Sequence, residues 1–382
     1  MQYGPICHYS ELNSVASVSI DSNGNTVLGL TTPTSKAFYL DSSNRAFGLV
    51  KLPVTPHVVS LENMTLNTFN PILSGGIAYG LTMTGLTIPN PVGGGLFGHG
   101  YKRDLVIQNS TWSFGRGDAN SSFAGTDEFD QFTNVTFSNN TISGYSTPEV
   151  EGAGIGTRIY LTEGSSQFTF TGNTFNKVSV SIAHTTDDVF KNNTFNDGYI
   201  TVGNAYTLAA DCVSAPQDFS QLSFNSSAAL DIELNIFNID DQYQPPNAIQ
   251  AGAYTNATIA NNTINYGGVY PFRLSMIAAA SGSISGNTIT ILQNALNSQL
   301  PAPIAFCVQT STTNTSNPTA GALPISVVSN TVNGAAVLTD VQVSDPGFAN
   351  APISCSKNNF NSSAQYTVIN TNPNNTNVSF TQ

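Results

Sequence analysis

The sequence is poor in charged residues. Only 9% of its 382 residues are Asp, Glu, Lys or Arg, whereas an ordinary soluble domain has about 25%. The 11 Lys and Arg residues are too few for the basic surface that binds a phosphate backbone, so we expect no nucleic-acid partner. The remaining imbalance is acidic, with a net charge of −12. No apolar run is long enough to cross a bilayer as a helix, so we expect no membrane span.

Cysteine and helix-forming residues are also scarce. The four cysteines have no metal-ligand spacing, so no metal or other cofactor is expected, and one or two disulfides remain open. The shortage of Glu, Lys, Arg and Gln disfavours long surface helices. A hydrophobic content of 40% excludes a disordered chain.

Neutral polar residues take the place of charge. The chain contains 43 Asn, 42 Thr and 41 Ser residues, together with 22 Phe and 14 Tyr. β-branched and aromatic residues favour strands, and Asn favours turns. The composition therefore predicts an all-β protein whose surface is solvated mainly by amides and hydroxyls.

A short pattern, apolar-x-apolar-x-Asn/Gly-x-Thr-apolar, recurs along the chain. Clear copies span residues 135–142, 168–175 and 257–264. The alternation predicts a strand, and the Asn pair predicts a corner because Asn tolerates left-handed backbone geometry. The second apolar residues of the copies serve as anchors: Ile20, Leu40, Leu61, Met83, Ile107, Phe137, Phe170, Phe190, Phe224, Ile259, Ile284, Val327, Cys355 and Phe380.

These anchors lie 20 to 43 residues apart and cover almost the whole chain. They predict a single β-solenoid of about 12–14 coils over residues 15–382, preceded by an N-terminal arm or cap at residues 1–14. Asn residues at equivalent corners are expected to form an amide ladder. The alternative is a β-sandwich with Asn-rich turns, although a sandwich has no reason to repeat one corner sequence.

The Asn-Asn-Thr-Ile and Gly-Asn-Thr-Phe corners resemble those of the pectin-lyase-like superfamily. This resemblance implies a right-handed parallel β-helix. The superfamily includes polysaccharide lyases, glycoside hydrolases, epimerases, phage tailspikes and surface adhesins. Members that hydrolyse polygalacturonate carry paired acids, then Gly-His-Gly and Arg-Ile-Lys. This chain has Gly98-His99-Gly100 and Arg158-Ile159-Tyr160, but it lacks the preceding acid pair, and Tyr160 stands where Lys is expected.

Asp187 and Asp188, with His184 nearby, are the candidate catalytic residues. Two carboxylates about 5–10 Å apart can act as acid and base on a glycosidic bond. Adjacent residues of a strand point to opposite faces, so a turn-capping role is the alternative.

Other polar groups suggest binding. We treat Asp127, Glu128 and Asp130 as a candidate Ca²⁺ site if they lie in an oxygen-rich loop, with solvated loop acids as the alternative. Long extensions between coils contain the candidate glycan-binding residues Tyr206, Asp240, Asp241 and Tyr243. The single tryptophan, Trp112, occupies an inward position and is expected in the core.

The chain is almost uncharged toward its C-terminal end. Only four charged residues follow Gln242, which favours either a glycan coat or burial against other subunits. The chain has thirteen Asn-x-Ser/Thr sequons. The candidate glycosylation sites are Asn63, Asn109, Asn139, Asn192, Asn261 and Asn377.

A charge-poor β-solenoid with sequons resembles exterior proteins of viruses and of prokaryotic cell surfaces. The leading interpretation is a non-catalytic, extracellular structural and recognition protein, such as a virion spike, fibre or surface adhesin. It would bind glycans or cell-surface polysaccharide and assemble as a homo-oligomer or with other virion or surface proteins. The rival interpretation is a secreted polysaccharide lyase or glycoside hydrolase.

Overall fold

The structure is a computed structural model of the chain. It describes residues 15–31, 59–67, 78–89, 102–113, 126–130, 132–144, 158–162, 165–182, 185, 187–202, 229–239, 247–252, 256–267, 273–277, 281–291, 304–309, 325–334, 339–344, 353–362, 368–370 and 378–381. Within these ranges every regular element is a β-strand.

Three parallel sheets form the solenoid. Sheet 1 has thirteen strands, of which β4 (Ala78–Tyr79) lies off the main path beside β7. Its path comprises β3 (Val59–Glu62), β5 (Leu81–Thr84), β7 (Lys102–Gln108), β10 (Phe132–Ser138), β13 (Ser166–Thr171), β16 (Asp188–Lys191), β19 (Ala229–Glu233), β22 (Asn256–Ala260), β25 (Ser281–Ser285), β28 (Ile325–Val328), β31 (Ile353–Ser356) and β34 (Val378–Thr381).

Sheets 2 and 3 are shorter. The ten strands of sheet 2 are β6 (Thr87–Ile88), β8 (Thr111–Ser113), β11 (Thr141–Ser143), β14 (Thr174–Asn176), β17 (Thr194–Asn196), β20 (Ile236–Ile239), β23 (Thr263–Tyr266), β26 (Thr288–Ile291), β29 (Thr331–Gly334) and β32 (Asn359–Ser362). The nine strands of sheet 3 are β9 (Thr126–Asp130), β12 (Arg158–Thr162), β15 (Ser179–Ile182), β18 (Ile200–Val202), β21 (Asn247–Gly252), β24 (Arg273–Ile277), β27 (Ile304–Gln309), β30 (Thr339–Ser344) and β33 (Val368–Asn370).

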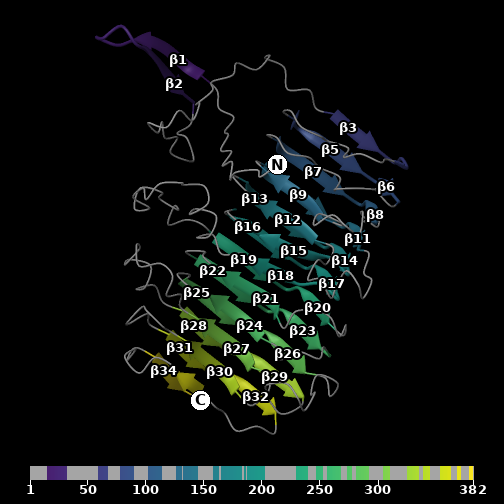
Figure 1. Cartoon of the computed structure of the whole chain (residues 1–382), viewed down its shortest axis with the longest axis vertical. Coiled ribbons are helices and arrows are strands. Elements are labelled where there is room, and N and C mark those ends of the chain that lie inside the picture. Colours follow the sequence, from purple (N-terminus) through teal and green to yellow (C-terminus); the bar gives the residue numbers. More distant parts are fainter. Residues whose placement is uncertain are drawn as a thin grey trace, which may run out of the picture.

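From β7 to β33, each coil adds one strand to each sheet in turn. For example, β10, β11 and β12 are followed by β13, β14 and β15, and each strand pairs in parallel with its counterpart one coil away. Figure 1 shows this stack running along the long axis from β3 to β34. The expected right-handed parallel β-helix is confirmed, and the path of sheet 1 contains twelve strands.

One inward row of sheet 1 contains most of the expected anchors. Phe137 pairs with Phe170, which pairs with Phe190, and the register continues to Phe380. The anchor at Phe224 is wrong, because Ile232 occupies that place in the register between Phe190 and Ile259.

Two further anchors lie near the start of the chain. Ile20 does not belong to a coil, because β1 (Val15–Ile20) pairs with β2 (Thr26–Leu30) in a separate antiparallel hairpin. Leu40 lies outside the described residues.

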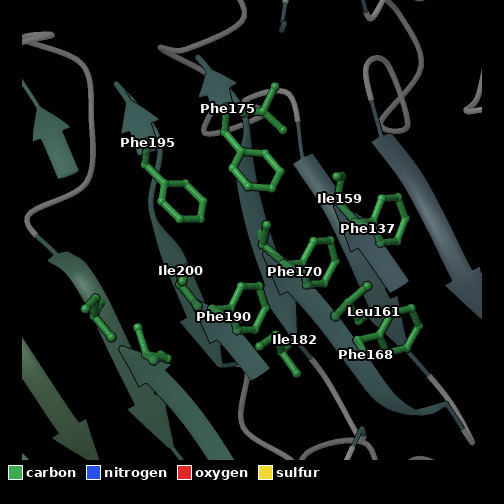
Figure 2. Close-up of a cluster of buried hydrophobic side chains, with 14 of the residues drawn as sticks. Phe137, Ile159, Leu161, Phe168, Phe170, Phe175, Ile182, Phe190, Phe195 and Ile200 are labelled. Atoms are coloured by element: carbon green, nitrogen blue, oxygen red, sulfur yellow. The ribbon is translucent and has the colours of Figure 1, made fainter. Parts of the chain in front are cut away.

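Phenylalanine rings stack through the core because the coils repeat at about 4.8 Å. The ring centroids of Phe137 and Phe170 lie 4.7 Å apart, and those of Phe170 and Phe190 lie 4.8 Å apart. The rings of each pair are nearly parallel. In sheet 2, Phe175 and Phe195 stack in the same way at 4.6 Å. Figure 2 shows both stacks pointing into the space between the sheets. Offset stacking adds to the stabilisation from burial.

Two consecutive residues form the corner between sheets 1 and 2: the first turns the backbone, and the second makes side-chain hydrogen bonds. The first residue is left-handed, with φ of 57° at Asn192. The second, Asn193, is buried, and its side-chain oxygen accepts hydrogen bonds from the backbone N–H and the side-chain amide of Asn173. Its own amide donates to the Phe170 carbonyl and to the side chain of Asn235. The expected amide ladder is confirmed.

This ladder continues with the same contacts from coil to coil. Its members are Asn140, Asn173, Asn193, Asn235, Asn262, Asn287, Asn330 and Asn358.

Candidate functional site

The side chains of the candidate catalytic acids Asp187 and Asp188 bind the backbone of different coils. Asp188 is fully buried at a core-facing position beside Leu230. Its carboxylate accepts hydrogen bonds from the Phe168 backbone N–H, at 3.1 Å, and from the Thr185 hydroxyl. Asp187 is left-handed, and its carboxylate accepts the Ala229 backbone N–H at 3.3 Å.

Both carboxylates therefore serve the backbone of neighbouring coils, as the turn-capping alternative proposes. Ser165 has the same role at the start of β10, since its buried hydroxyl accepts the Phe132 N–H and donates to the Phe129 carbonyl. In this conformation the Asp188 carboxylate has no access to a polysaccharide. His184, the third member of the candidate group, lies outside the described residues.

The candidate Ca²⁺ ligands do not lie in a loop. Asp127, Glu128 and Asp130 belong to strand β9, so that aspect of the expectation is wrong. The parallel register sets Asp127 beside Ile159 and Glu128 beside Tyr160. Among the residues that the structure describes, no group of three or more His, Cys, Asp or Glu is arranged to hold a metal ion. Metal binding by these acids remains a prediction.

The remaining sequence candidates fall into two groups. The glycan-binding candidates Tyr206, Asp240, Asp241 and Tyr243, and the sequon residue Asn377, lie outside the described residues. Five sequon residues share one structural position, the left-handed first residue of the corner between sheets 1 and 2, with exposed side chains: Asn63, Asn109, Asn139, Asn192 and Asn261. Their glycosylation remains a prediction.

Trp112 lies in the core, as expected, with 1% of its surface exposed and its ring 6.0 Å from that of Phe137. Lys102 is also buried, with its ammonium group 4.8 Å from the ring centre of Phe132, and it was not among the expected core residues. The left-handed residue Asp104 interrupts the strand alternation between Lys102 and Leu105 and thereby turns both inward. A simple alternation count would place Lys102 outside.

A charged group on the outer face of sheet 1 was not expected either. Asp231 and Glu233 alternate with the buried Leu230 and Ile232 along β19. Glu233 forms an ion pair of 3.1 Å with Lys191 on the adjacent strand. The alternation of acid and apolar residues was the available signal.

The outer face of sheet 2 is different, because its described outward side chains carry no charge. We call this surface the Thr-Asn face. Its first row is Thr87, Thr111, Thr141, Thr174, Thr194, Ile236, Thr263, Thr288, Thr331 and Asn359. Its second row is Ser113, Ser143, Asn176, Asn196, Asn238, Asn265, Thr290 and Asn333.

The second row contains its own amide ladder, which the corner pattern did not predict. Asn196 donates to Asn176 at 2.8 Å, Asn238 donates to Asn196 at 2.9 Å, and Asn265 donates to Asn238 at 2.9 Å. These side chains are half-buried, so the ladder fixes the orientation of amides at the surface. The Thr-Asn face therefore presents the same few side-chain types at equivalent positions of successive coils.

The stacked sheets and the buried Asn ladder place the chain in the class of right-handed parallel β-helices. No protein-family model matches the sequence. No curated protein matches it. A similar solved structure is that of the Streptococcus pneumoniae surface protein and adhesin PfbA, with 12% identity, coverage of 84% of each chain and a TM-score of 0.46. Among the described residues, no helix could span a membrane.

Proposed function

We propose that this chain is an extracellular structural and recognition protein that binds glycans without cleaving them. The protein would be a virion spike, fibre or surface adhesin built on a pectin-lyase-like β-helix. The observation that carries the proposal is the position of the candidate acids Asp187 and Asp188. Asp188 is buried and accepts a hydrogen bond from the Phe168 backbone N–H, and Asp187 accepts one from the backbone of the next coil.

The outward chemistry of sheet 2 supports recognition of carbohydrate. Hydroxyls and amides both donate and accept hydrogen bonds, as sugar hydroxyls do. The low charge of the chain disfavours ligands that need many ion pairs. The scarcity of charge after Gln242 is consistent with an exterior protein that is glycosylated or packed against other subunits.

Self-association belongs to the same proposal. A spike or fibre requires several copies, and the nearly uncharged region after Gln242 is the one we assign to the subunit contact. Mass measurement of the native protein by light scattering tests this point. A monomer over the micromolar range would count against a spike.

A polysaccharide screen tests recognition and chemistry together. The full chain is incubated with neutral polymers (laminarin, mannan) and with anionic polygalacturonate, and both retention and product release are measured. We expect retention of at least one polymer with neither new reducing ends nor unsaturated products. Product release by the wild type that is lost in Asp188→Asn would overturn the non-catalytic proposal and favour the lyase or hydrolase interpretation.

A further inference from the structure

The Thr-Asn face offers polar groups that the fold leaves unused. The hydroxyls of Thr141, Thr174 and Thr194 make no hydrogen bond to any described residue, and their side chains are half-buried. Asn196 uses one amide hydrogen and accepts one hydrogen bond within the ladder. An amide has two donors and two acceptor sites, so Asn196 retains one of each for a ligand.

These groups form a regular grid. Neighbouring coils repeat at about 4.8 Å, and the two rows are two residues apart along each strand, or about 6.7 Å. The rows run along the edge of the solenoid formed by sheet 2, from β6 to β32, on the right-hand side of Figure 1. A ligand that fits the grid should therefore itself be long and repetitive.

The chemistry of the face selects the kind of ligand. Its described side chains carry no charge, so an anionic polymer would gain no ion pairs there. Ile236 is the one apolar side chain in the two rows, whereas the centre of a protein–protein interface is mostly apolar. A neutral polysaccharide meets both conditions, because it repeats hydroxyl groups along its length and has no charge to neutralise.

We propose that the Thr-Asn face binds a neutral polysaccharide chain lying along the solenoid axis. This inference rests on the proposed glycan-recognition function and assigns it a surface and a ligand class. Neither row contains an aromatic ring for sugar stacking, so each sugar contributes weakly and many contacts act together. Affinity should therefore increase steeply with the length of the oligosaccharide.

The test compares matched substitutions on two sheets. Thr174→Val with Thr194→Val removes two adjacent hydroxyls from the Thr-Asn face and keeps side-chain shape and strand preference. Thr136→Val with Thr169→Val makes the same change on two adjacent strands of the outer face of sheet 1. Binding of the full-length proteins to laminarin, mannan and their oligosaccharides of increasing length is measured by calorimetry.

We expect the sheet 2 pair to raise the Kd about tenfold, from the loss of two ligand hydrogen bonds. The sheet 1 pair should leave the Kd within about twofold. Thr174→Ser with Thr194→Ser retains the hydroxyls and should bind nearly as the wild type does, which separates hydrogen bonding from folding defects. Circular dichroism confirms that each variant is folded.

Three outcomes would overturn this assignment. Wild-type binding that is equally affected, or unaffected, by the two valine pairs would place the glycan site elsewhere and leave the recognition function standing. Preference for polygalacturonate over every neutral polymer would contradict the ligand class. Absence of wild-type binding to all of these polymers would overturn both this inference and the proposed function.

Discussion

The buried Asn ladder makes a quantitative prediction at Asn193. Its side chain is 1% exposed and makes four hydrogen bonds, each 2.9 Å long. Replacing it with Ala leaves the Asn173 N–H and the Phe170 carbonyl without that partner inside the solenoid. A buried polar group that loses its partner costs about 1–3 kcal/mol.

The losses share one site and partly relax, so they do not add fully. We expect Asn193→Ala to lower the free energy of unfolding by about 3–5 kcal/mol. Chemical denaturation measures the global change. Because a solenoid can open locally, hydrogen exchange should also show the largest loss of protection in β13, β16 and β19.

The neighbouring residue supplies the control. Asn192 is exposed and left-handed, and its side chain makes no hydrogen bond to a described residue. Glycine adopts this backbone conformation without strain, so Asn192→Gly should change stability by less than about 1 kcal/mol. Equal effects of Asn193→Ala and Asn192→Gly would refute the view that the ladder stabilises the corner.

Three further changes test other regions of the structure. Asp188→Ala leaves the Phe168 N–H and the Thr185 hydroxyl without their acceptor and should cost about 2–3 kcal/mol by denaturation. Asp188→Asn keeps an acceptor and should cost less, and equal costs would contradict the structural role. Leu234→Asn should raise the free energy of unfolding by about 1 kcal/mol, seen as a higher denaturation midpoint. The reason is that Leu234 is exposed and has a left-handed backbone conformation, with φ of 57°, which Asn tolerates better than Leu. A loss of stability would contradict this strain. Burial raises the pKa of the Cys355 thiol from 9.0 to about 12. The neutral thiol therefore contributes stability below pH 9, and this contribution is lost as the pH rises toward 12. At pH 8, peptide mapping should find Cys355 unlabelled by a thiol reagent until denaturant is added.

The repeat was predictable from sequence wherever the corner had its common form. Alternation and Asn pairs identified the register from Leu61 to Phe190 and again after Ile259. The coil between them was misplaced because its corner has apolar residues, Leu234 and Ile236, at the two positions that are polar or Gly in the other described corners. The ladder residue Asn235 is present there, but one Asn is too weak a signal.

The candidate site was harder to predict, because burial depends on the phase of each strand. Asp188 occupies a row that is apolar in the adjoining coil, at Leu230. The repeat did carry this signal, because Asp188 stands two residues before the anchor Phe190, at the first apolar position of the pattern. The Thr-Asn face was visible as composition but not as a surface. Its rows exist only when residues about 20 to 43 positions apart align, and that alignment requires the correct register.

The corner also explains five of the thirteen sequons. The first corner residue favours Asn for its left-handed backbone, and the outward residue that opens the next strand is usually Thr, two positions later. Together, these two structural preferences produce the sequence Asn-x-Thr without any requirement for a glycan. Asn109 and Asn139 share this position on adjacent coils, about 4.8 Å apart along the axis. Two glycans would crowd each other at that spacing, so a corner sequon follows from the backbone requirements of the corner and is not by itself a sign of an attached glycan.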